Sequence, residues 1–142
     1  MGKKISNFII NSENDINLFV TNIIDDIKKT KLVLLSGDLG AGKTTLAKEI
    51  VFQLIGYQKV LSPTFTIVNQ YINDNVSIFH YDLYRLECED ELFNLSLEED
   101  IEQGYVLIEW PNIATRLLRK YEYLNIHIEL QGNKRYISLS ST

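Results

Sequence analysis

The sequence predicts an α/β fold, a three-layer sandwich in which helices flank a mixed central sheet. Three observations lead to this fold class. A short apolar run, a glycine-rich loop and a helical pattern follow one another over residues 32–54. Two other apolar runs, residues 77–82 and 105–109, each end in an acidic residue. Strand-like runs joined by turn residues add antiparallel hairpins to the parallel strands.

Length and composition indicate one globular domain over residues 1–142. The chain is 45% hydrophobic and 23% charged, which is ordinary for a soluble domain with a core. No apolar run is long enough to span a membrane, and the single cysteine, Cys88, excludes an internal disulfide and a cysteine metal cluster. We therefore expect a cytoplasmic protein without a membrane partner. The net charge of −5, with no basic block, argues against tight direct binding to nucleic acid.

The first half of the chain predicts a strand, a helix, a second strand and a second helix. Residues 5–10 predict an edge strand. Ser12 is a suitable helix cap with Asp15 three residues later. An apolar stripe at helical spacing follows, formed by Ile16, Val20, Ile23 and Ile27. Residues 32–36 predict a buried parallel strand, and residues 44–54 predict a helix from the spacing of their apolar positions.

The middle of the chain predicts a hairpin and a helix. Strand-like runs over residues 62–71 and 76–84 flank the turn composition Asn-Asp-Asn at residues 73–75. Residues 95–103 predict a helix that opens with a capping box, Ser96 to Glu99.

The last third predicts a strand, a helix and a terminal hairpin. Residues 105–110 are strongly apolar and predict a central strand that Pro111 ends. Residues 112–120 predict a helix. Two strands, residues 123–130 and 135–139, predict a hairpin about Gly132.

Residues 37–44 carry the full phosphate-binding pattern Gly-x-x-x-x-Gly-Lys-Thr, which predicts a P-loop NTPase-like fold. Backbone N–H groups of the loop and the N-terminus of the next helix attract phosphate. In this pattern Lys43 can reach the β- and γ-phosphates, and the Thr44 hydroxyl can bind Mg²⁺. A glycine turn with an unrelated lysine is the alternative, but it leaves the flanking strand and helix unexplained. The residues expected at the nucleotide are Gly37, Asp38, Leu39, Gly40, Ala41, Gly42, Lys43, Thr44 and Thr45.

Two acidic residues are candidates for the partner that a phosphate loop needs for Mg²⁺. Glu109 ends the run YVLIE, and Asp82 ends the run SIFHYD. We favour Glu109 as the metal ligand because its strand is the more buried by pattern, and Asp82 as the residue that orients water. Either residue can instead be a solvated carboxylate at a strand end, and the division of roles between them stays open.

Four further residues are weighed between a functional and a structural role. Thr64, in Ser-Pro-Thr, fits a hydroxyl that senses the γ-phosphate, or an ordinary turn before a strand. Arg85 either neutralises phosphate or lies on the surface. His80 shares a strand face with Asp82, and a core or hydrogen-bonding role fits it as well as catalysis. Trp110 packs near the nucleotide or in the core.

The base is predicted to be adenine, so the expected substrate is ATP. A guanine-reading Asn-Lys-x-Asp pattern would need an aspartate where Tyr136 stands in NKRY. Lys134 or Arg135 is expected to contact the base or ribose.

Taken in order and spacing, GDLGAGKTTLAK, SPTFTIVNQY, HYDLYRL and LIEWP resemble the TsaE family, also called YjeE. Its members are small bacterial ATPases of the pathway that makes threonylcarbamoyladenosine at position 37 of tRNA. The likeness runs from about Ile5 to Ser138. It departs from the family at Ser96, where a glycine is common, and we expect a serine cap to serve there.

The resemblance implies site residues and partners. Thr44 and Glu109 would hold Mg²⁺, with Lys43 on the phosphates of ATP. Asp82 would be needed for hydrolysis, Thr64 would lie in a switch-like segment, and Trp110 would lie close to the site.

The family's partners are TsaB and TsaD, which form a pair. TsaD transfers the threonylcarbamoyl group to tRNA, and hydrolysis by the TsaE-like chain resets the complex between turnovers. The acidic charge agrees with tRNA being held by the partners.

Three functions remain open from the residues. The first is a partner-controlled ATPase that is weak alone. The second is a binding module whose nucleotide sets the shape of an assembly surface. The third is a kinase, although 142 residues leave little chain for a lid.

Overall fold

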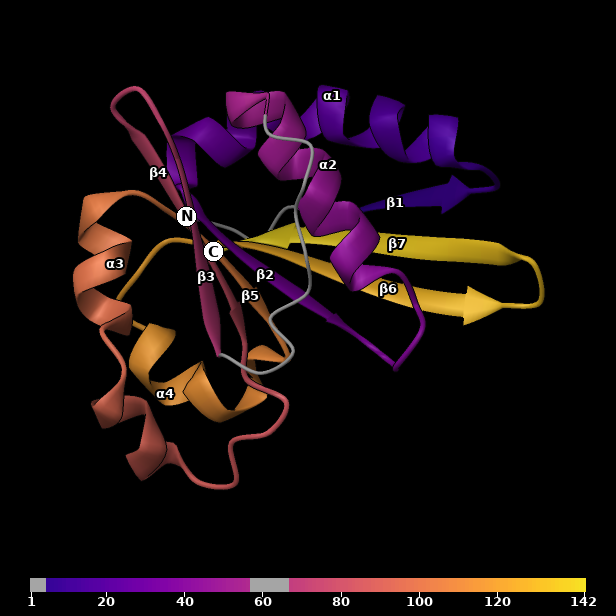
Figure 1. Cartoon of the computed structure of the whole chain (residues 1–142). Helices are drawn as coiled ribbons and strands as arrows, with labels where there is room; N and C mark the ends of the chain where they lie inside the picture. The colour runs from indigo at the N-terminus through magenta and orange to yellow at the C-terminus, as the bar shows by residue number, and fades with distance from the viewer. Residues whose placement is uncertain (1–4, 57–66) are drawn as a thin grey trace.

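The computed structural model describes residues 5–56 and 67–142, and the described residues form one seven-stranded sheet with helices on both faces (Figure 1). The strands are β1 (Ile5–Ile10), β2 (Leu32–Gly37), β3 (Val68–Asn73), β4 (Val76–Asp82), β5 (Tyr105–Glu109), β6 (Leu124–Gln131) and β7 (Lys134–Ser141). The α-helices are α1 (Glu13–Thr30), α2 (Lys43–Ile55), α3 (Leu97–Gln103) and α4 (Thr115–Leu118), and the 3-10 helices are η1 (Glu89–Asn94) and η2 (Pro111–Ala114). No helix within these ranges is long and apolar enough to cross a membrane.

The sheet is mixed, as predicted. Its strand order is β1-β7-β6-β2-β5-β4-β3, so β1 is an edge strand. The pairs β6–β2, β2–β5 and β5–β4 are parallel, and the pairs β1–β7, β7–β6 and β4–β3 are antiparallel. Both predicted hairpins are present: β3 with β4, and β6 with β7.

Two apolar layers enclose the sheet, which confirms the three-layer sandwich. Because side chains alternate along a strand, Val33 and Leu35 of β2 face α1 and α2, whereas Leu32 and Leu34 face the opposite layer. That second layer comes from η1, α3, η2 and α4 and packs on β2, β5 and β4. Figure 1 shows α1 and α2 along one side of the sheet and α3 and α4 along the other.

Helix α1 begins as the sequence predicts. The Ser12 hydroxyl accepts the N–H of Asp15 at 3.4 Å, and the Asp15 carboxylate accepts the N–H of Asn11 at 2.9 Å. The predicted stripe of Ile16, Val20, Ile23 and Ile27 is buried together with Phe19. The cap fixes where the helix starts, and the stripe fixes the face that packs on the sheet.

The predicted capping box at Ser96 is wrong. Ser96 precedes α3, but its side chain makes no capping hydrogen bond, because its backbone (φ −92°, ψ 36°) is not the extended conformation that aims a hydroxyl at the helix. Glu91, in the unpredicted helix η1, instead accepts the N–H groups of Glu87 and Cys88 at 3.0 and 3.3 Å.

The helix predicted over residues 112–120 is shorter and divided. The 3-10 helix η2 starts at Pro111, and α4 is a single turn that ends at Leu118. Pro111, Ala114 and Leu118 are the buried positions of η2 and α4, so a short apolar contact holds this segment on the sheet before the chain returns to β6.

Two predicted strands differ from the structure in their bounds. Strand β4 ends at Asp82 rather than at residue 84, because the Asp82 carboxylate accepts the N–H of Tyr84 at 3.0 Å and turns the chain. Strand β3 begins at Val68, and residues 62–66 of that prediction lie outside the described residues. The β3–β4 turn consists of residues 74 and 75, with Asp74 at φ 53°.

Tyr81 joins β4 to α3, and its replacement by phenylalanine tests that link. Its hydroxyl donates to Asp100 Oδ2, and burial, with this carboxylate, raises the pKa of Tyr81, so the hydroxyl stays a donor. Tyr81→Phe is expected to lower the free energy of unfolding by about 1 to 2 kcal/mol, because Asp100 loses its partner. Denaturant titration followed by circular dichroism measures the change.

Tyr105→Phe on the neighbouring strand β5 is the matched control. Among the described residues the Tyr105 hydroxyl has no hydrogen-bond partner, so the same chemical change should leave stability nearly unaltered. Equal losses of unfolding free energy in the two variants would contradict a stabilising role for the Tyr81–Asp100 hydrogen bond.

Candidate functional site

The candidate site lies at the C-terminal ends of the parallel strands β2, β5 and β4. In the parallel register Leu35 of β2 pairs with Glu109 of β5, and Glu109 pairs with Asp82 of β4. The glycine-rich loop leaves β2 at Gly37, two residues beyond its pair with β5. The two predicted acidic residues and the loop therefore meet at one edge of the sheet.

Two glycines of the loop have positive φ angles and close neighbours that leave little room for a side chain. Gly37 has φ 143°, and a Cβ there would lie 2.3 Å from the carbonyl oxygen of Ile128 in β6. Gly42 has φ 109°, and a Cβ there would lie 3.1 Å from Nε of Arg135. Gly42 is also the N-cap of α2, so the loop passes directly into the N-terminus of that helix. Backbone N–H groups at such a terminus bind anions.

Lys43, the first residue of α2, is held inside the loop. Its ammonium donates to the carbonyl oxygens of Gly37 at 2.6 Å and Asp38 at 2.9 Å. It also lies over the Trp110 ring, 4.1 Å from the ring centroid. Burial lowers the pKa of Lys43, and the Glu109, Asp82 and Asp38 carboxylates oppose that shift. The loop thus carries a cation among carbonyl and carboxylate oxygens.

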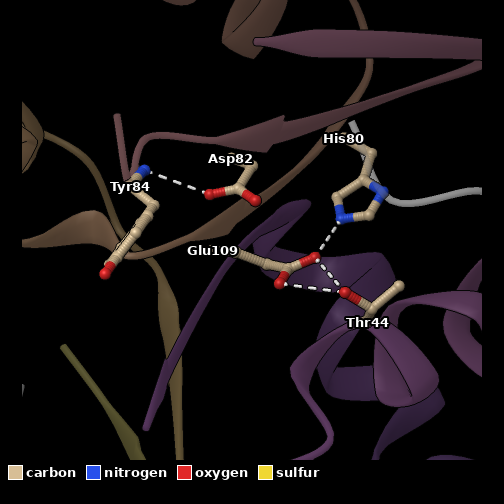
Figure 2. Close-up of polar contacts among 5 residues, drawn as sticks. All are labelled: Thr44, His80, Asp82, Tyr84 and Glu109. Carbon is tan, nitrogen blue, oxygen red and sulfur yellow. Dashed lines mark hydrogen bonds and ion pairs between the residues drawn. The ribbon is translucent and has the colours of Figure 1, made fainter. Parts of the chain in front are cut away.

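Thr44, Glu109 and His80 form a hydrogen-bonded group beneath the loop (Figure 2). The Thr44 hydroxyl lies 3.1 Å from both oxygens of the Glu109 carboxylate, and His80 Nε2 lies 2.6 Å from Glu109 Oε2. Glu109 is 3% exposed and His80 is 0% exposed. His80 therefore takes the hydrogen-bonding role that the sequence left open.

The donor chemistry of Thr44 and Glu109 fits Mg²⁺. A hydroxyl and a carboxylate are the hard oxygen donors that this ion prefers, and Mg²⁺ at nucleotide sites takes one or two protein donors besides phosphate and water. No group of three His, Cys, Asp or Glu side chains in the described ranges is arranged as a metal site.

Asp82 lies beside Glu109 and is held by the chain that follows it. Its Oδ1 accepts the N–H of Tyr84 at 3.0 Å. Burial raises the pKa of Asp82, and the nearby Glu109 carboxylate adds to the rise, whereas the Tyr84 N–H, His80 and Arg85 oppose it. Arg85 itself is exposed and does not line the cleft.

Trp110 is held against Lys43 by backbone geometry and by a second ring. It follows β5 with φ 57°, in the left-handed region, and its N–H donates to the carbonyl oxygen of Leu35 at 3.2 Å. The Tyr84 ring packs on it with a centroid distance of 4.8 Å and an interplanar angle of 49°. Tyr84 was not among the predicted site residues. Its position two residues after Asp82 is the sequence feature that could have indicated it.

Arg135 is the basic residue of the terminal hairpin that reaches the loop. Its Nε donates to the carbonyl oxygen of Ala41 at 2.9 Å, whereas Lys134 is exposed and does not line the cleft. Thr64, predicted to sense phosphate, lies outside the described residues. A cleft of 320 Å³ is lined by Leu39, Gly40, Gly42, Lys43, Thr44, Thr45, Asp82, Glu109, Trp110 and Arg135.

Comparisons with known proteins support the resemblance drawn from the four motifs. The family model of the threonylcarbamoyl adenosine biosynthesis protein TsaE matches residues 10–137. The tRNA threonylcarbamoyladenosine biosynthesis protein TsaE of Rickettsia felis is 37% identical over 133 residues, which cover 92% of this chain and 77% of the relative. The same-named protein of Rickettsia typhi is 36% identical over 132 residues, covering 92% and 91%.

A solved structure supports the fold. The crystal structure of Bacillus subtilis YdiB matches with a TM-score of 0.69 and 26% identity, covering 99% of this chain and 88% of that chain. The match confirms the predicted fold class.

Gly37→Ala tests how tightly the loop is tied to the sheet. The Cβ would press on the Ile128 carbonyl, so β2 and β6 must separate locally, and φ 143° is strained for alanine. We expect the free energy of unfolding to fall by at least about 3 kcal/mol. Thermal and denaturant unfolding measure the loss.

Gly40→Ala is the control for this substitution. Gly40 has φ 80° but no atom within 4 Å of a Cβ, so only backbone strain of about 1 kcal/mol is expected. If the Gly37 variant is as stable as the Gly40 variant, the close approach of Gly37 to β6 does not restrict which side chain this position tolerates.

Proposed function

The chain belongs to the TsaE family of threonylcarbamoyl adenosine biosynthesis proteins, and on that premise we propose that it is a magnesium-dependent ATPase of tRNA modification. The observation that carries the proposal is the contact of the Thr44 hydroxyl with both Glu109 oxygens at the N-terminus of the loop helix. This contact joins a metal-binding pair to a phosphate-binding loop in one cleft with Lys43.

The reaction we propose is attack of water on the γ-phosphate of ATP. A bond forms from the water oxygen to the γ-phosphorus, the bond to the β–γ bridging oxygen breaks, and ADP, phosphate and one proton from the water leave. Loop N–H groups and Lys43 bind the phosphate oxygens. Mg²⁺ held by Thr44 and Glu109 would neutralise charge on the β- and γ-phosphates. Asp82, half-buried beside Glu109, orients the attacking water.

The side chains around the loop support binding of ATP. Trp110 lies over Lys43 and offers an aromatic face at the cleft. Arg135 reaches the loop from β7 and lines the same cleft, where it is placed to contact the ribose or base. Tyr136 stands where a guanine-reading aspartate would be needed, which favours adenine.

The partners we propose are TsaB and TsaD. The chain would bind this pair in the cytoplasm and use hydrolysis to reset it between turnovers, while the partners hold the tRNA. A net charge of −5 favours this division, because a direct grip on tRNA needs clustered basic residues. We place Thr64 in the segment that responds to the γ-phosphate.

ATP hydrolysis by the chain alone, and then with the TsaB–TsaD pair, tests the proposal. We expect weak activity alone, strong stimulation by the pair, and loss of about 100-fold or more in Lys43→Ala, because the phosphate charge is no longer stabilised. Phosphate release measures the rate.

Lys48→Ala is the control, since Lys48 is an exposed lysine on the same helix and should leave the stimulated rate unchanged. A Lys43→Ala protein that hydrolyses ATP normally in the assembly would refute the mechanism. A flat response to the pair, with ATP still bound, would instead favour a nucleotide-dependent binding module.

A further inference from the structure

His80 is a buried polar residue that the proposed reaction does not use. It comes from β4, two residues before Asp82, and its side chain is fully buried. It therefore cannot contact a water or phosphate in the cleft. Its contact with the site is the 2.6 Å approach of Nε2 to Oε2 of Glu109, drawn as a dashed line in Figure 2.

The sheet register places His80 behind the Glu109 carboxylate. His80 pairs with Leu107 of β5, so Glu109 is its diagonal neighbour on the same face of the sheet. Thr44 reaches the same carboxylate from α2. The carboxylate is thus held from two elements at once, by a strand neighbour and by the helix of the loop.

The proton on His80 can be assigned from its acceptor. A carboxylate oxygen only accepts, so Nε2 carries the hydrogen and donates it to Glu109. Nδ1 is buried and finds no hydrogen-bond partner among the described residues. An unpaired buried nitrogen costs free energy that an apolar side chain of similar size would avoid. Packing alone therefore does not account for a histidine here, whereas the bond to Glu109 does.

We propose that His80 is a positioning residue for the magnesium site, an inference that rests on the proposed Mg²⁺–ATP function. Its Nε2–H engages Oε2 of Glu109 and so fixes the plane of the carboxylate. Oε1, which His80 does not contact, would then be the oxygen available to Mg²⁺ beside Thr44. His80 in this way sets how strongly Mg²⁺ increases nucleotide affinity, without touching the nucleotide.

ADP binding with and without Mg²⁺ tests this role apart from hydrolysis. Trp110 is the single tryptophan of the chain and lines the cleft, so its fluorescence reports binding. His80→Leu removes the donor, whereas His80→Gln keeps an N–H at a similar reach. We expect His80→Leu to reduce the Mg²⁺-dependent gain in ADP affinity by about 10-fold or more, with the Mg²⁺-free affinity little changed. His80→Gln should recover most of the gain.

Ile78→Val is the packing control, because Ile78 lies on the same strand and face without contacting Glu109. It should keep the full gain. If the unaltered chain shows no effect of Mg²⁺ on ADP binding, the proposed function itself fails. If it shows the effect and a folded His80→Leu retains it in full, the inference about His80 alone is refuted.

A measurement on the unaltered chain covers the case in which His80→Leu does not fold. Nitrogen-15 NMR of the histidine rings distinguishes the two tautomers directly. We expect His80 to carry its proton on Nε2 and its ring signals to shift on addition of Mg²⁺ and ADP, but not with ADP alone. A proton on Nδ1, or the same shift without Mg²⁺, would overturn the proposal.

Discussion

The parallel pairing of β2 with β5 is the constraint on which the site depends. It sets Leu35 opposite Glu109, so the loop that follows β2 opens beside a carboxylate 65 residues away from Thr44. The next parallel pair sets Asp82 opposite Glu109. Because parallel strands end at one edge, backbone register brings together the loop, Glu109, which we propose as the metal ligand, and Asp82, which we propose orients water. Side-chain contacts then refine positions that the sheet has already fixed.

Burial of charge at this edge links the fold to its chemistry. Glu109 is buried and Asp82, on the neighbouring strand, is half-buried; burial raises the pKa of Asp82 and lowers the pKa of Lys43. Burial at this end of the sheet therefore disfavours the charged forms of Asp82 and Lys43 unless further opposite charges lie nearby. The divalent cation and nucleotide phosphates that we propose for this site would supply those partners.

The features that could be predicted from the sequence are those that depend on residues close together in the chain. The loop motif, the terminal carboxylates Glu109 and Asp82, and the Ser12 cap all follow from neighbouring residues, and the structure brings the motif and the acids together. The prediction for Ser96 was wrong, because the capping-box residues are present but the backbone at Ser96 is not in the extended conformation that a cap needs. Tyr84 was also missed, because the packing of its ring on Trp110 depends on a turn after β4 and a left-handed residue after β5. The sequence left Lys134 and Arg135 as alternatives, and in the structure Arg135 is the one that contacts the loop and lines the cleft.

The most direct measurement is a crystal structure of the chain with Mg²⁺ and a non-hydrolysable ATP analogue. The account predicts the triphosphate along the N–H groups of residues 37–44, the metal bound between the phosphates and the Thr44 hydroxyl, and Glu109 on the metal side with Asp82 nearer the γ-phosphate. An analogue bound in another cleft, or a metal ion with Glu109 turned away from it, would contradict the account.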